Sequence, residues 1–281
     1  MSKENKVSED IKGKLTVVNA ENYSTDDYIT PNQSANTLFH FMRKYDWLCD
    51  TLKTSKICPR YYEERFDFLD RSLPSLAFPM KCFCDIYLEK LHFHISTYGA
   101  YGLGFSKEWL ISQNVQPVQY INPHSEIGVV LRNEFIRYVE KYGDNIPKDK
   151  FYDMLFRQLR YIKPLYGNTR RDDIEDRHNF HDEREWRFIP DIPIEDAFVD
   201  LVWNGAYCNL KKIQQGSEEL SKNEHYVIPF TSNELKYIIV PTEKDSEKIR
   251  HFIFDELQIN EIEKLALISK ILVYDVSKED W

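Results

Sequence analysis

Hydrophobic and polar residues follow two regular patterns from about residue 34 onward. Short apolar runs, several with the two-residue period of a strand, occur at TLFHF, KCFCDI, VQPVQYI, HYVIPF, LKYIIV and KILVYDV. Apolar residues spaced three and four apart predict amphipathic helices near residues 131–139 and 151–162, and SEKIRHFIFDEL predicts a third helix between the last two strands. This mixture predicts an α+β fold with a mixed β-sheet.

The first 33 residues have a different character. They are polar and rich in turn-forming residues, with one strand-like run, KLTVV. We therefore expect residues 1–33 to form a peripheral N-terminal arm and residues 34–281 to form a single α+β domain.

Three glycines lie within six residues, at Gly99, Gly102 and Gly104, and predict a loop. Ser106 is a candidate N-cap for a helix that begins at Lys107. The spacing of the glycines is not G-x-G-x-x-G, and the sequence contains neither a Walker A motif nor G-x-S-x-G. Rossmann, P-loop and α/β-hydrolase classes are therefore disfavoured.

Composition narrows the class of protein further. A formal net charge of -9 disfavours indiscriminate attraction to nucleic acid or to an anionic membrane. No apolar run reaches the ~18 residues of a membrane span, and the N-terminus lacks the apolar core of a signal peptide. Five scattered cysteines indicate free thiols in a reducing compartment. We expect a cytoplasmic protein that does not bind membranes.

One locally basic stretch interrupts this acidic chain between residues 157 and 171. Its cations, interleaved with tyrosines, are Arg157, Arg160, Lys163, Arg170 and Arg171. A solvated surface is one explanation for such a stretch, and contact with an anionic partner is the other. The four arginines are thus candidates for binding a macromolecular substrate such as RNA or DNA.

Two carboxylates precede alternating aromatic and aliphatic residues in FHDEREWRFIP. If this segment is extended, Glu183 and Glu185 point to one side and Arg184 points to the other. Two carboxylates on one face repel, so they could serve a metal ion, a cationic group or a pair of ribose hydroxyls. The alternative is a surface pair at a strand end, with local salt bridges from Arg184 and Arg187.

Two other groups of residues contain potential metal ligands. The first group consists of Cys82, Cys84, His92 and His94, but its one-residue gaps do not match the usual C-x₂₋₄-C spacing of zinc sites. The second group could build the divalent-metal site of a nuclease beside the acidic pair, and consists of His178, His181 and Asp182. Neither pattern is specific, and we assign no metal.

Several segments together resemble the AbiGi family of abortive phage resistance proteins. In chain order they are SANTLFHFM, PMKCFCDIYL, HISTYGAYGLGFSKEWL followed by PVQY, FHDEREWRFIP, and finally NELKYIIVP. This family is similar, more distantly, to DarT-like ADP-ribosyltransferases. The resemblance implies an ADP-ribosyltransferase-like mixed sheet with flanking helices, and NAD as the substrate.

The same resemblance implies roles for individual residues. Glu185 would be the catalytic carboxylate, and Glu183 would orient the acceptor. The residues implied to bind NAD are His40, at the ribose, and Tyr98, Tyr101 and Phe105. ADP-ribosyl transfer passes through an oxocarbenium-like ribose, which a fixed carboxylate stabilises electrostatically.

Three functions stay open on these grounds. The first is an anti-phage abortive-infection protein that transfers ADP-ribose from NAD to a nucleic acid or protein acceptor. The second is a non-enzymatic antitoxin or regulatory module that binds a partner toxin, since members of the family are described as antitoxin-like. The third is a metal-dependent nuclease that uses Glu183, Glu185 and His181.

Overall fold

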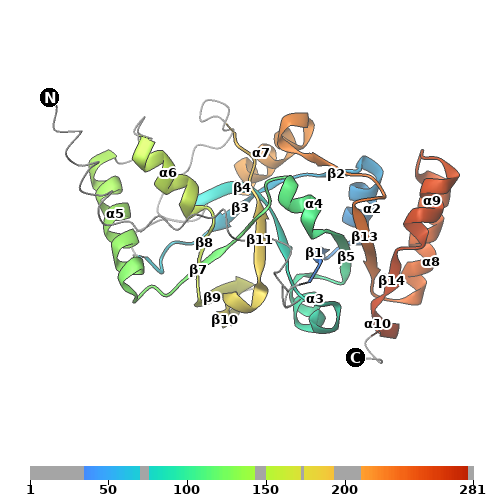
Figure 1. Cartoon of the computed structure of the whole chain (residues 1–281), viewed down its shortest axis with the longest axis horizontal. Helices are drawn as coiled ribbons and strands as arrows, with labels where there is room; N and C mark the ends of the chain where they lie inside the picture. The colour runs from blue at the N-terminus through green and yellow to red at the C-terminus, as the bar shows by residue number, and fades with distance from the viewer. Residues whose placement is uncertain (1–34, 70–75, 143–149, 172–173, 193–209, 278–281) are drawn as a thin grey trace, which may run out of the picture. The chain divides into compact units, whose positions relative to one another are not determined.

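The computed structural model describes residues 35–69, 76–142, 150–171, 174–192 and 210–277, which all fall within one unit, Ser34–Trp281 (Figure 1). The arm expected over residues 1–33, including KLTVV, lies outside the described residues. Among the helices that the structure describes, none combines the length and the hydrophobicity needed to cross a bilayer.

An eight-stranded mixed sheet forms the centre of the fold, in the order β14-β13-β5-β1-β4-β11-β6, with β3 paired to β4 beside this path. The strands are β1 (Thr37–Met42), β3 (Arg60–Glu64), β4 (Leu76–Cys84), β5 (Tyr101–Ser106), β6 (Gln116–Pro117), β11 (Glu185–Phe188), β13 (Leu235–Val240) and β14 (Ile271–Val273). The β13–β14 pair is parallel, and the other pairs of this sheet are antiparallel. The predicted α+β class with a mixed sheet is confirmed.

Six further strands form two-stranded ladders. These strands are β2 (Lys56–Ile57) with β12 (Ile228–Pro229), β7 (Gln119–Ile121) with β8 (Ile162–Pro164), and β9 (Tyr166–Arg171) with β10 (Ile174–Asn179). The sequence VQPVQYI, predicted as one strand, is divided between β6 and β7. The β7–β8 ladder is parallel and brings residue 120 beside residue 163.

Helices flank the sheet, as Figure 1 shows. The α-helices are α2 (Tyr45–Thr54), α3 (His92–Tyr98), α4 (Lys107–Ser112), α5 (Glu126–Tyr142), α6 (Lys150–Leu159), α7 (Leu210–Lys222), α8 (Glu243–His251), α9 (Glu261–Ile268) and α10 (Tyr274–Ser277). Short 3₁₀ segments occur at η3 (Leu88–Lys90), η4 (Phe180–Glu183) and η6 (Glu224–Tyr226), and η7 (Phe252–Glu256) is a π-helical continuation of α8. The three predicted amphipathic helices correspond to α5, α6 and α8.

The sequence predicted a loop at the glycine-rich stretch, and this prediction is wrong. Gly102 and Gly104 lie inside the central strand β5. A Cβ atom would lie 2.7 Å from the Phe41 ring at Gly102, and 2.8 Å from the Phe39 ring at Gly104. Both rings belong to the neighbouring strand β1, so the missing side chains make room for them. Gly99, with a φ of 114°, does form the turn before β5.

Alternation along β1 divides the sheet into two faces. On one face Leu38 and Met42 join the largest hydrophobic cluster. On the other face Phe39 packs with Cys84, and Glu185 lies directly opposite Cys84 in the β11–β4 register. His40 lies on the same side of β1 as Leu38 and Met42, so we call that side the His40 face. We call the other side the Glu185 face. This division decides which of the predicted site residues can meet.

Candidate functional site

Glu183 and Glu185 come together through a turn and not through a continuous strand. Glu183 ends η4, and Arg184 has a left-handed φ of 43°, so the condition of an extended segment is met only from residue 185 onward. The Arg184 carbonyl still accepts a hydrogen bond of 3.0 Å from the Asp85 amide, which anchors the turn to the end of β4. The carboxylates of Glu183 and Glu185 nevertheless converge on one side chain, which is Lys163.

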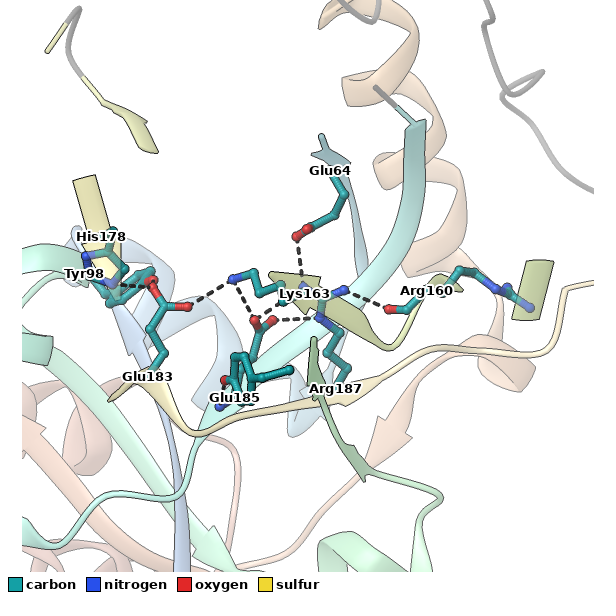
Figure 2. Close-up of polar contacts among 9 residues, drawn as sticks. Glu64, Tyr98, Arg160, Lys163, His178, Glu183, Glu185 and Arg187 are labelled. Atoms are coloured by element: carbon teal, nitrogen blue, oxygen red, sulfur yellow. Dashed lines mark hydrogen bonds and ion pairs between the residues drawn. The ribbon is translucent and has the colours of Figure 1, made fainter. Parts of the chain in front are cut away.

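The ammonium of Lys163 lies between the two carboxylates (Figure 2). Its Nζ is 2.9 Å from Oε2 of Glu183 and 2.7 Å from Oε2 of Glu185. Lys163 comes from β8, and its Nζ lies 4.8 Å from the centre of the Phe180 ring. The cation that the acidic pair serves is therefore a side chain of the protein itself.

Arg187 supplies the second cation of the site and is 0% exposed to solvent. Its Nε lies 2.7 Å from Oε1 of Glu185, and its Nη2 lies 2.9 Å from Oε1 of Glu64. Nη1 donates to the carbonyl of Arg160 at 2.7 Å. The sequence analysis gave local salt bridges from Arg184 and Arg187 as the alternative explanation. The salt bridge between Arg187 and Glu185 is present, but it is buried, and Arg187 also pairs with Glu64 of β3.

Aromatic side chains complete the site. The Tyr98 hydroxyl donates to Oε1 of Glu183, and Nε2 of His178 lies 3.1 Å from the same oxygen. The Tyr120 hydroxyl accepts the Glu185 amide hydrogen at 2.8 Å. The ring of Tyr120 in turn packs edge-on against His181.

Burial and the two cations shift the pKa values of Glu183 and Glu185 in opposite directions. Burial by itself would raise the pKa of Glu183, but Lys163, helped by His178 and Tyr98, lowers that pKa to about 2. Burial opposes ionisation of Glu185 too, and Arg187 and Lys163 hold its pKa well below the usual range. The opposite charges raise the pKa values of Lys163 and Arg187 despite the cost of burying them. All four groups are charged at neutral pH.

Comparison with known proteins places this chain in a family. A family model described as "Putative abortive phage resistance protein AbiGi, antitoxin" matches residues 55–241. The chain belongs to the AbiGi family. The abortive phage resistance protein AbiGi of Lactococcus lactis subsp. cremoris is 32% identical over 245 residues, covering 79% of this chain and 98% of that relative. No solved structure matches the chain.

In this AbiGi-family chain, His40 is not brought together with the acidic pair. It points to the His40 face, where its ring meets Phe83 edge-on, while Glu185 points to the opposite face. Its Nδ1 donates a hydrogen bond of 2.9 Å to the backbone carbonyl of Cys82 on β4. Burial lowers the pKa of His40 well below its ordinary value, so the ring is neutral.

The remaining residues assigned to NAD binding are also divided between the faces. Phe105 is buried in the core of the His40 face, and the Tyr101 hydroxyl donates to Asp245 on α8 at 3.3 Å. Tyr98 does reach Glu183, as described above. One of the four predicted NAD contacts therefore lies at the acidic pair.

The basic stretch does not form one surface in this AbiGi-family chain. Arg157 pairs with Asp191 at 2.6 Å, and Arg160 supplies a carbonyl to Arg187. Lys163 points inward to the carboxylates. Arg170 and Arg171 belong to β9, and their side chains lie outside the described part of the structure. Their assignment to a nucleic acid contact stays a prediction.

Residues of both candidate metal sites make other contacts. Asp182 accepts a hydrogen bond from Asn179, Nδ1 of His92 lies 2.8 Å from the Tyr274 hydroxyl, and His94 stacks on Tyr98. Within the residues that the structure describes, no three His, Cys, Asp or Glu side chains gather in a way that could hold a metal ion. Between Glu183 and Glu185 the place of a divalent ion is taken by the Lys163 ammonium.

The sequence did not indicate Glu64 or the inward direction of Lys163. Glu64 lies in RYYEE, which has no hydrophobic alternation to distinguish its two faces. Lys163 lies in IKP between two buried residues, and that alternation is a weak sign that its side chain points away from its neighbours. Neither position could be linked to residue 185 by local spacing.

Proposed function

We propose that this chain is an antitoxin component of an abortive phage resistance system and acts by binding a partner toxin protein. The observation that carries this proposal is that every carboxylate oxygen of the acidic pair already faces a partner within the chain. Oε1 and Oε2 of Glu183 face Tyr98 and Lys163, and those of Glu185 face Arg187 and Lys163. The family description, which includes the word antitoxin, supports the same function.

A catalytic carboxylate has to face its substrate. Here a substrate would have to displace Lys163 or Arg187, and the displaced cation would lose its partner inside the protein. Breaking a buried ion pair in this way costs about 3–5 kcal/mol. The acidic pair is therefore better suited to holding distant chain segments together than to reacting.

A surface suited to a protein partner occurs at η7 and α9, which pack together. Phe254, Ile262 and Leu265 are 50%, 80% and 57% exposed, and the spacing of three between the last two places them on one side of α9. Nζ of Lys264 donates to the Phe254 carbonyl at 2.6 Å and fixes η7 against the helix. We call this the η7–α9 surface.

Charge favours a basic partner for the η7–α9 surface. Residues 252–263 contain four carboxylates, Asp255, Glu256, Glu261 and Glu263, and no lysine or arginine. Exposed apolar side chains rimmed by charge are typical of protein–protein interfaces, and a partner with complementary charge binds faster and more specifically. The toxin that fits here carries apolar residues surrounded by lysine or arginine.

Replacing Ile262 and Leu265 together with aspartate is expected to weaken toxin binding by tenfold or more and to abolish protection from the toxin. Two charges would then enter an interface that has to be desolvated. The measurements are the dissociation constant with a purified candidate toxin from a neighbouring gene, and growth during co-expression of the two.

The matched control replaces Ile127 on α5 and Met154 on α6 with aspartate, because both are about as exposed as Leu265 but lie outside the η7–α9 surface. The control variant should bind as the wild type does. Equal binding by the Ile262/Leu265 variant, with both variants folded, would reject the η7–α9 surface. Failure of the wild type to bind any co-encoded toxin would reject the antitoxin function itself.

Transfer of ADP-ribose from NAD to a nucleic acid or protein is a second candidate. It follows from the distant similarity to DarT-like enzymes, and one observation favours it: Tyr98, assigned to the nicotinamide side, touches Glu183. The separation of His40 from Glu185 by the sheet weighs against it. Its acceptor would be a macromolecule, with the arginines of residues 157–171 as candidate contacts.

Incubation of the purified protein with adenine-labelled NAD and cell lysate is expected to give no label transfer above background. Label that appears with the wild type, is lost in Glu185→Gln and remains in Glu64→Gln would replace the antitoxin proposal by a transferase. The two variants are matched, since each removes one carboxylate that contacts Arg187. Circular dichroism establishes that both are folded.

A further inference from the structure

Lys81, in β4, is a buried amine that has no counter-ion among the residues that the structure describes. Its residue is 9% exposed, and within the described part of the chain its Nζ takes part in no hydrogen bond and no ion pair. Buried lysines are almost always paired, because an ammonium removed from water without a partner is strongly destabilised. The groups whose charges act most on Lys81 are Cys58, Arg60 and Cys82, and none is a carboxylate.

The surroundings of Lys81 carry other polar groups on the His40 face. Lys81 lies opposite Phe188 in the β4–β11 register, and its charge acts directly on His40. Because Nδ1 of His40 donates to the Cys82 carbonyl, its Nε2 carries the lone pair of the neutral ring. The half-buried thiol of Cys58 follows β2 and completes the group. The cluster thus combines a cation, an acceptor and a weak donor.

The nitrogens of this cluster are not sealed from solvent. Among the described residues, Oδ1 of Asp85 and Oγ of Ser246 are fully enclosed and make no hydrogen bond, but neither Nζ of Lys81 nor Nε2 of His40 belongs to that group. The carboxylate of Glu224, whose charge acts on Cys58, is paired with Lys56.

We propose that Lys81, His40 and Cys58 form a binding site for the anionic group of a small ligand, a phosphate or a carboxylate, on the sheet face opposite the acidic pair. The ammonium would supply the positive charge and up to three donated hydrogen bonds. Nε2 of His40 would accept a hydrogen bond from a hydroxyl on or beside the anionic group. The site goes beyond the antitoxin function and shares no residue with the η7–α9 surface.

The charge state of Lys81 supplies an independent expectation for this site. Burial, with a smaller contribution from Arg60, lowers the pKa of Lys81 to about 8. An anion binds the ammonium form and not the neutral amine, so affinity decreases as the pH rises through this value. Between pH 7 and pH 9 the protonated fraction, and with it the affinity, should fall by about tenfold.

The test is calorimetric titration of the full chain with inorganic phosphate and, separately, with acetate, at constant ionic strength set by sodium chloride. We expect saturable binding of one of the two, weakened about tenfold from pH 7 to pH 9. Lys81→Met should abolish binding of either anion, and His40→Asn should weaken phosphate binding severalfold, because phosphate carries a hydroxyl that can donate to Nε2 and acetate does not. Lys56→Met is the matched control, since Lys56 is a neighbouring lysine that already has a carboxylate partner.

Lys81→Met also reports on folding, because methionine removes an unpaired buried amine and the melting temperature should stay the same or rise. No saturable binding of either anion at pH 7, or equal binding by wild type and Lys81→Met, would overturn the site. Toxin binding by Lys81→Met should equal that of the wild type, so failure of this site and failure of the antitoxin proposal give different results.

Discussion

Replacement of Lys163 with methionine is expected to destabilise the folded protein by about 3–5 kcal/mol at pH 7. Glu183 and Glu185 would lose the ammonium that each contacts within 3 Å, and two buried like charges would face each other. The measurement is urea unfolding at pH 7, supported by thermal unfolding. A loss of this size corresponds to a fall in melting temperature on the order of 10 °C.

Removing Glu183 at the same time should reverse part of this effect. In the Lys163→Met/Glu183→Gln double variant only Glu185 stays charged, and Arg187 still neutralises it. A coupling free energy of about 2 kcal/mol between the two substitutions is expected. Lys248→Met, which removes a half-exposed ion pair with Asp245, is the control and should change stability by less than about 1 kcal/mol. Equal effects of the Lys163 and Lys248 substitutions would contradict a buried charge network.

Acid is expected to unfold the protein by protonating the same pair. The pKa of Glu183 is about 2 in the folded protein against an ordinary 4.5, so the unfolded chain takes up the proton first. The stabilisation is therefore fully present above pH 4.5 and is lost as the pH falls toward 2. By linkage, Glu183 alone contributes about 3 kcal/mol, of which about 2 kcal/mol is lost by pH 3.

Urea unfolding between pH 6 and pH 3 measures this dependence. Glu183→Gln should be less stable at pH 6 but should show a shallower decline on acidification than the wild type, because it has lost one group that must be protonated. Glu219→Gln, which changes an exposed carboxylate on α7, should keep the wild-type slope. Parallel profiles for the wild type and Glu183→Gln would mean that folding does not lower the pKa of Glu183.

The network joins parts of the chain that are distant in sequence. Glu64 is on β3, Lys163 is on β8, and Glu183 to Arg187 span η4 and β11. An ion pair inside a protein contributes less to stability than its geometry suggests, because both charges lose their hydration. We expect its main role to be to specify one arrangement of these segments, since any other arrangement would leave a buried charge without a partner.

Periodicity along the sequence was sufficient for the elements that are regular over their whole length. Strands at TLFHF and LKYIIV and the helices α5, α6 and α8 are present as predicted, because alternation and helical spacing are local properties. The family resemblance, carried by strings such as EREWR, is confirmed by the comparisons. The same local reasoning was wrong at Gly102 and Gly104, where rings from β1 require glycine inside a strand.

The sequence by itself determined the α+β class, most of the principal elements, the family and the presence of an acidic pair beside a strand. The tertiary structure alone decided what that pair contacts, and it placed His40 on the opposite face of the sheet from Glu185. The physical reason is that a side chain's direction follows from local backbone geometry, whereas its charge partner depends on which distant segments pack together. Lys163 and Glu64 lie about 20 and 120 residues from Glu185, a separation that no spacing rule covers.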